Sequence, residues 1–346
     1  MALVPKKKPP QKGPDEAALR EDLKKHCLSG NVTDAIAVLD ASPSQVNEAL
    51  DSQGSTALHM CSLAGQLQVA QELIAAQAEV NVTDAAGRTP LHIAAAEGHS
   101  GMVQALLNAS IDANAVDKTQ QTALHKAAYH SNVEVAKALC EHPGIDIALK
   151  DGVSKSTPLS IAAEYGKIEL VEYMLTVDAT LGVAENDCGW SPLHLAAHGK
   201  EMKTSTSLKP AKYSNIAKLL LHAKAPVDAF DEDRKTPLHR AACAGNAGTV
   251  LVLIAAEANL NAQDSCRWTP LHYACQEGHL EVVKQLLAAK AKVQEEKPGC
   301  LVPLAVATME CHVHIAEVLL QYGADPNARA KGAASPAMIA RQDETR

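Results

Sequence analysis

The stretch TPLHYACQEGHLEVVKQLLAAKAKV, residues 269–293, carries the signals of two helices separated by a glycine. Thr269 is a good helix cap and Pro270 a good first helical residue, since the missing N–H of proline costs no hydrogen bond there. After Gly278, apolar residues recur at helical spacing, which predicts a second, antiparallel helix. The apolar residues of that second helix are Leu280, Val282, Val283, Leu286 and Leu287. Because such a unit cannot bury its apolar faces alone, it predicts neighbours of the same kind.

The same unit recurs along the chain at nearly constant spacing. With the threonine of the Thr-Pro pair as anchor, successive steps are 33, 33, 35, 34, 45, 33, 33 and 33 residues. The anchors are Thr56, Thr89, Thr122, Thr157, Ser191, Thr236, Thr269, Val302 and Ser335. A period of about 33 residues with a T-P-L-H-x-A core is the ankyrin signature. The chain therefore resembles the ankyrin-repeat family over residues 16–341, which implies an all-α solenoid of helix–turn–helix repeats joined by β-hairpin turns.

The anchors also predict how the chain is divided. The 45-residue step after Ser191 places an insertion at about residues 200–214, inside the fifth repeat, and this insertion is rich in lysine, serine and threonine. The predicted segments are a disordered basic, proline-rich tail (1–14), a degenerate N-terminal capping repeat (15–50), eight ankyrin repeats (51–330), and a C-terminal capping half-repeat with a tail (331–346).

Composition excludes several classes of function. A net charge of −8 argues against a nucleic-acid-binding surface. No stretch approaches the roughly 18 apolar residues of a membrane span. The nine cysteines are scattered and include no C-x-x-C pair, which favours a reducing compartment. We therefore expect a monomer in the cytoplasm or nucleus. Lys6, Lys7 and Lys8 could direct nuclear import, although a solvated tail is the favoured explanation.

The chain is rich in histidine, which prompts a search for an active site. Six histidines are the fourth residue of the repeat motif, where an imidazole can bond the capping hydroxyl and the adjoining turn: His59, His92, His125, His194, His239 and His272. His194 and His198 have the spacing of a zinc pair, but a third ligand is missing. No phosphate loop, dinucleotide fingerprint or nucleophile elbow occurs. We expect no catalytic residue, cofactor or metal, and an enzyme or metal protein built on repeats remains the less favoured alternative.

Residues expected at the surface are better candidates for a functional site than the histidines. In the family that this chain resembles, hairpin tips and first helices line a concave face. Both tryptophans, Trp190 and Trp268, precede a repeat anchor and so lie at hairpin tips, with Lys235 at the tip between them. Tips do not contribute to the core between helices, and tryptophan, tyrosine and arginine are the residue types enriched at binding hot spots. The alternative is that each indole covers the neighbouring hairpin.

These positions predict a protein-binding surface. The predicted partner-binding residues are Trp190, Lys235, Trp268, Arg240, Tyr273, Tyr129, Tyr165 and Arg88. The central patch is expected to be cationic and aromatic, which favours an acidic or extended peptide as its ligand. We therefore expect a non-enzymatic scaffold or adaptor that binds another protein. A regulatory protein gated by modification of the loop at 200–214 is the alternative.

Overall fold

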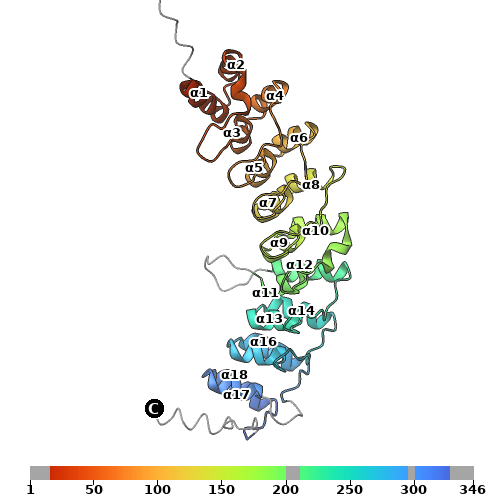
Figure 1. The fold of residues 1–346 in the computed structure, drawn as a ribbon. Helices are drawn as coiled ribbons and strands as arrows, with labels where there is room; N and C mark the ends of the chain where they lie inside the picture. The colour runs from red at the N-terminus through yellow and green to blue at the C-terminus, as the bar shows by residue number, and fades with distance from the viewer. Residues whose placement is uncertain (1–15, 200–210, 295–300, 328–346) are drawn as a thin grey trace, which may run out of the picture. The chain divides into compact units, whose positions relative to one another are not determined.

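The computed structural model describes residues 16–199, 211–294 and 301–327 (Figure 1). The predicted N-terminal tail, residues 200–210 of the insertion and the predicted C-terminal half-repeat lie outside the described residues. Within the described residues the chain forms 18 α-helices, two short 3-10 helices and no strand. The helices fall into two compact units, Met1–Ile145 and Asp146–Arg346.

Unit 1 consists of helix pairs whose first members pack on one another and whose second members pack on one another, in two layers (Figure 1). The first layer contains α1 (Glu16–Ser29), α3 (Ala57–Ala64), α5 (Pro90–Glu97) and α7 (Ala123–His130). The second contains α2 (Val32–Ala41), α4 (Leu67–Ala75), α6 (Ser100–Asn108) and α8 (Val133–Cys140), with η1 (Pro43–Asn47) following α2.

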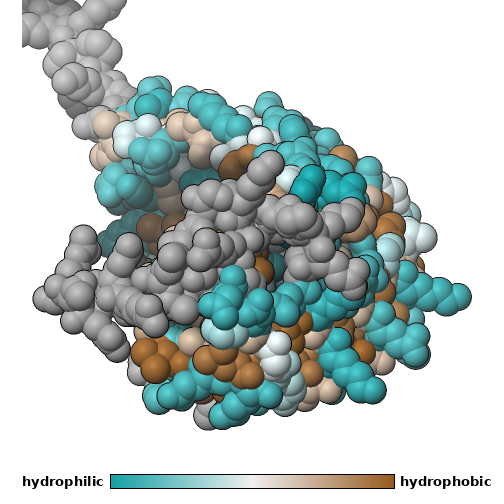
Figure 2. Space-filling view, turned by 90° about the horizontal axis from the view of Figure 1, so that it is seen from below, coloured by the Kyte–Doolittle hydropathy of each residue, from teal (hydrophilic) through white to brown (hydrophobic). Residues whose placement is uncertain are grey.

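Unit 2 has the same two layers. Its first layer contains α9 (Pro158–Glu164), α11 (Pro192–His198), α13 (Pro237–Ala244), α15 (Pro270–Gln276) and α17 (Pro303–Met309). Its second contains α10 (Ile168–Val177), α12 (Lys212–His222), α14 (Ala247–Ala255), α16 (Leu280–Ala288) and α18 (Val313–Gln321), with η2 (Ala179–Val183) following α10. Figure 2, seen from below, shows hydrophobic residues in small groups between hydrophilic ones. In α17 and α18, Met309 and Val313 are more than half exposed.

Within each unit, motif histidines join one repeat to the next. In the second repeat, the Thr89 N–H donates to Nδ1 of His92 (3.1 Å), and Nε2 of His92 lies 2.9 Å from the carbonyl of Gln121 in the following turn. The Nδ1 atom therefore accepts and the Nε2–H donates, so the ring is neutral. The same pair of contacts occurs at His59, His194, His239 and His272.

A second link crosses the repeats at the glycine that ends the first helix. Gly245 has a φ of 68°, and a Cβ built there would lie 2.5 Å from the ring of His279. Because glycine leaves this space open, His279 packs over the end of α13 and bonds the carbonyl of Cys243 at 3.0 Å. After the insertion, Tyr213 makes the equivalent link: its hydroxyl donates to the carbonyl of Glu164 at 3.2 Å.

The turns between repeats are tight and stack on one another. The N–H of Asp264 donates to the carbonyl of Trp268 within one turn, and the N–H of Ser265 donates to the carbonyl of Asp233 in the preceding turn. These bonds close each turn without building a strand in the described residues. The all-α repeat solenoid is thus confirmed, and its turns project a row of side chains beside the first helices.

Candidate functional site

Two of the predicted residues, Trp190 and Arg240, stack on each other. Trp190 lies in the turn before α11, and Arg240 lies in α13 of the next repeat. The guanidinium carbon of Arg240 is 4.0 Å from the centroid of the indole ring, within the range of a cation–π contact. The Trp190 ring also lies edge-on to the His198 ring, with the two ring centroids 5.4 Å apart.

Three more predicted residues form a second group of contacts. The Lys235 ammonium nitrogen lies 5.1 Å from the centroid of the Tyr273 ring, and the Tyr273 and Trp268 rings lie 5.2 Å apart. Asp233 connects the two halves, because its Oδ2 is 3.4 Å from Lys235 Nζ and 3.6 Å from Arg240 Nη2. We call Trp190, Arg240, Lys235, Tyr273 and Trp268 the aromatic–cation ladder. All five residues are partly buried.

Buried carboxylates hold the ladder in place. Oδ1 of Asp231 accepts the N–H of Lys235 at 2.8 Å, and its Oδ2 accepts from Nε of Arg240 at 2.9 Å and also pairs with Nη2. The Asp231 side chain is fully buried, and that of Arg240 is only 15% exposed. Ion pairs removed from water in this way are sensitive to the loss of either partner.

Asp264 has the equivalent role in the next repeat. Its Oδ1 accepts the N–H groups of Cys266 and Trp268, and its Oδ2 accepts the hydroxyl of Tyr273 at 2.6 Å. Burial, and next the hydrogen bond to this carboxylate, raise the pKa of Tyr273 far above its usual value. Tyr273 is therefore a neutral donor whose ring is fixed against Trp268.

This geometry corrects the expectation of a cationic patch. Arg240 and Lys235 are both paired with carboxylates, and Asp264 adds a third negative charge beside two positive ones. The sequence contained the signal: Asp231 precedes Arg240 by the same nine residues that separate Asp264 from Tyr273 and Asp117 from Lys126. The spacing alone does not show, however, that the second oxygen of each aspartate reaches the following helix.

The other predicted residues lie elsewhere. Arg88 and Tyr129 belong to unit 1, and Tyr165 is the C-cap residue of α9 in unit 2. The guanidinium of Arg88 pairs with Asp84 at 2.7 Å and is 43% exposed. Tyr129 is 44% exposed, near the end of α7, with its ring edge-on to His130. Neither Tyr129 nor Tyr165 is part of the aromatic–cation ladder.

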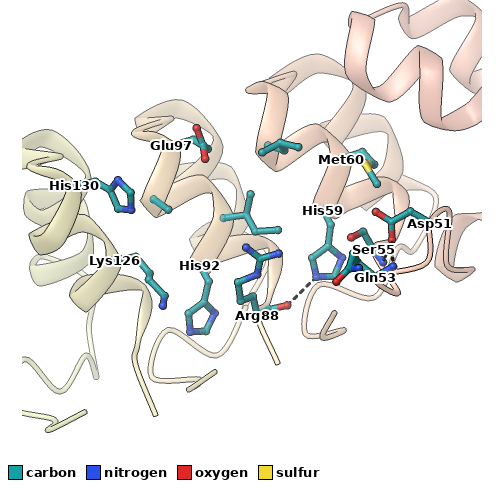
Figure 3. A pocket seen from close by; sticks show the side chains of 13 residues that line it. Asp51, Gln53, Ser55, His59, Met60, Arg88, His92, Glu97, Lys126 and His130 are labelled. Atoms are coloured by element: carbon teal, nitrogen blue, oxygen red, sulfur yellow. Dashed lines mark hydrogen bonds between the residues drawn. The ribbon is translucent and has the colours of Figure 1, made fainter. Parts of the chain in front are cut away.

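Unit 1 contains a cavity of about 410 Å³ beside α3, α5 and α7 (Figure 3). Met60, Leu63 and Ile93 form its apolar part. Its polar lining includes Asp51, Gln53, Arg88, Glu97, Lys126 and His130. In Figure 3, Asp51 and Met60 lie at one end of the cavity, and Lys126 and His130 lie at the other.

In the possible zinc pair, both ring nitrogens of His194 already take part in hydrogen bonds within the protein. Nδ1 of His194 accepts from the Ser191 N–H at 3.2 Å, and its Nε2 is 3.0 Å from the carbonyl of Lys235. Across the described residues, no group of three or more histidine, cysteine or acidic side chains is placed to hold a metal ion. None of the helices there is both long and apolar enough to cross a bilayer.

Comparison with known proteins agrees with this architecture. The family model for ankyrin repeats in three copies matches residues 58–151, 207–297 and 259–330, which together are more than half of the chain. The chain belongs to the ankyrin-repeat family. A Rickettsia felis protein named for its ankyrin repeats is 32% identical over 110 residues, which is 32% of this chain and 43% of that protein. Ankyrin repeats are in general protein–protein interaction modules.

Proposed function

We propose that this ankyrin-repeat protein is a non-enzymatic adaptor that binds a partner protein through the aromatic–cation ladder of unit 2. The observation that carries the proposal is that three successive repeats contribute five partly buried side chains in two contact groups, Trp190–Arg240 and Lys235–Tyr273–Trp268, which Asp233 bridges. A row of aromatic and basic side chains beside the first helices has the composition of a binding hot spot.

The ladder is rigid before any partner arrives. Asp231 and Asp264 fix the helix residues Arg240 and Tyr273, so few rotamers remain to be lost on binding. Because carboxylates offset both of its cations, the ladder gains affinity from aromatic contact more than from positive charge. The ligand that suits it is an extended segment of a protein that lays apolar or planar side chains across Trp190 and Trp268.

Affinity capture from cell extract tests this proposal. The Trp190→Ala/Trp268→Ala variant removes both indoles without breaking an ion pair, whereas Arg240→Ala would also disturb the fold. Leu251→Ala is the matched control, since Leu251 lies on α14 of the same unit and is 52% exposed. Circular dichroism checks that all three proteins are folded. We expect the wild type and the Leu251 variant to capture the same partner, and the double variant to lose it. Equal capture by all three would contradict the proposal.

We also propose the cellular compartment in which the protein works. Cys61 and Cys275 are buried thiols in α3 and α15, at core positions with no disulfide. A reducing compartment suits such thiols, so we place the protein in the cytoplasm or nucleus. Imaging of a fluorescent fusion, with and without residues 1–14, would locate it, and accumulation in an oxidising compartment would contradict this assignment.

A further inference from the structure

The Oδ2 atoms of the turn aspartates point to a second candidate site, which lies in unit 1. Where the turn residue is Asp84, Asp117 or Asp231, Oδ2 pairs with a basic side chain of this chain; these side chains are Arg88, Lys126 and Arg240. At Asp264 the partner is the hydroxyl of Tyr273. In each of these turns, therefore, a side chain of this protein donates to Oδ2 of the aspartate.

Asp51 lacks such a donor. Its Oδ1 accepts the N–H groups of Gln53 and Ser55, both at 2.9 Å, as in the other turns. The residue nine positions later is Met60, which cannot donate a hydrogen bond or carry charge. Within residues 16–199, 211–294 and 301–327, no side chain bonds to or pairs with Oδ2 of Asp51. The carboxylate is thus held in the geometry that receives a cation elsewhere in the chain.

The cavity beside Asp51 suits the rest of a long basic side chain. Met60, Leu63 and Ile93 supply apolar surface for an aliphatic stem. The two cations that line the cavity, Arg88 and Lys126, already pair with Asp84 and Asp117 and so do not neutralise Asp51. The volume of about 410 Å³ is within the range of small-ligand pockets, which is about 300–1,000 Å³.

We propose that the cavity beside α3, α5 and α7 binds an arginine side chain of a partner protein, with its guanidinium on Asp51 and its stem along Met60 and Ile93. The partner's side chain would form with Asp51 the same ion pair that Arg240 forms with Asp231 within this chain. This second surface lies in unit 1 and shares no residue with the aromatic–cation ladder, so it does not depend on the function proposed above.

Two substitutions isolate the contact. Asp51→Asn removes the charge but keeps the turn, because Asn186 already occupies the equivalent position and its Oδ1 accepts the N–H groups of Cys188 and Trp190. Met60→Arg places a cation where Arg240 stands in its own repeat, so the chain would fill the site itself. Glu72→Gln is the control for charge, since Glu72 is an exposed residue of α4 away from the cavity.

The probes are fluorescein-labelled peptides with one central arginine, arrayed with varied flanking residues, and the same peptides with citrulline in its place. We expect anisotropy to show that arginine peptides bind the wild type and the Glu72 variant. Citrulline in the peptide, Asp51→Asn or Met60→Arg should each weaken binding about tenfold or more, the usual size of a lost charge-assisted hydrogen bond. Urea unfolding checks that neither cavity variant is destabilised.

This proposal would be overturned if no arginine peptide bound the wild type, if arginine and citrulline peptides bound equally, or if Asp51→Asn bound as the wild type does. The Trp190→Ala/Trp268→Ala variant separates this site from the ladder, since it should bind the arginine peptides normally. Loss of binding in that variant would show that the peptides occupy the ladder instead.

Discussion

The ion pair of Asp231 and Arg240 shows how one residue serves both fold and surface. Asp231 is fully buried, and its Oδ2 accepts from the guanidinium that also lies over Trp190. Truncation of Arg240 would leave a buried carboxylate with no cation on that oxygen. We expect Arg240→Ala to lower the free energy of unfolding by about 3 kcal/mol, as for other buried pairs that lose one partner. Urea unfolding followed by circular dichroism measures this change.

Arg88 provides the comparison for this prediction. Its carboxylate partner Asp84 is also buried, but the guanidinium is 43% exposed and water can reach the pair. Arg88→Ala should therefore cost about 1 kcal/mol or less. In the Arg240→Ala background, Asp231→Asn should restore some of the stability, because Asn186 shows that an amide holds the same turn. Equal losses at Arg240 and Arg88 would contradict the role assigned to burial.

At the scale of the repeat, the motif histidines make stability depend on pH. Burial lowers the pKa of His59, His92, His194 and His239, in the last case to about 4. In the unfolded chain these rings titrate near pH 6.5, at about the reference value for histidine. Between the folded and unfolded pKa values the unfolded chain binds more protons, so stability falls as the pH is lowered from 6.5 towards 4. The stability that the neutral histidines contribute is fully present above pH 6.5.

We expect a loss of about 2 kcal/mol at pH 5 from His239 alone, since each pH unit below the unfolded pKa costs about 1.4 kcal/mol. The physical cause is burial of the ring, which disfavours its charged form. Because Nδ1 also accepts the N–H of Thr236, a proton there would face another donor. Urea midpoints at pH 7.5 and pH 5 measure the effect. His239→Asn should be less stable at pH 7.5 but show a smaller pH dependence. The same pH dependence in both proteins would rule out His239 as the titrating group.

The helices could be predicted from sequence because each repeat is specified by local signals. Helix α15 begins at Pro270 and α16 at Leu280, as the capping and periodicity of that stretch predict. The candidate site could be predicted only partially. The period places Arg240 and Tyr273 beside the hairpin tips, but it does not show that a turn carboxylate nine residues earlier reaches them. That contact depends on the conformation of the turn, which repeat spacing does not specify.

At the scale of the whole molecule, the two proposed surfaces belong to different units. Every residue assigned to the cavity lies between Asp51 and His130, and the ladder lies between Trp190 and Tyr273. In repeat proteins each repeat contacts only its neighbours, so stability and side-chain geometry are set locally. This locality predicts that substitutions on one surface leave the intrinsic affinity of the other unchanged.

We therefore expect the losses in binding free energy to add when Asp51→Asn is combined with Trp190→Ala/Trp268→Ala. For a purified partner identified by capture, calorimetric titration of the wild type, each variant and the combined variant gives the four values needed. Independent sites should be additive within about 0.5 kcal/mol, as for distant residues with no shared contacts. A larger coupling energy would show that the partner changes one surface through the other. A combined loss no greater than that of either variant would mean that one surface alone carries the complex.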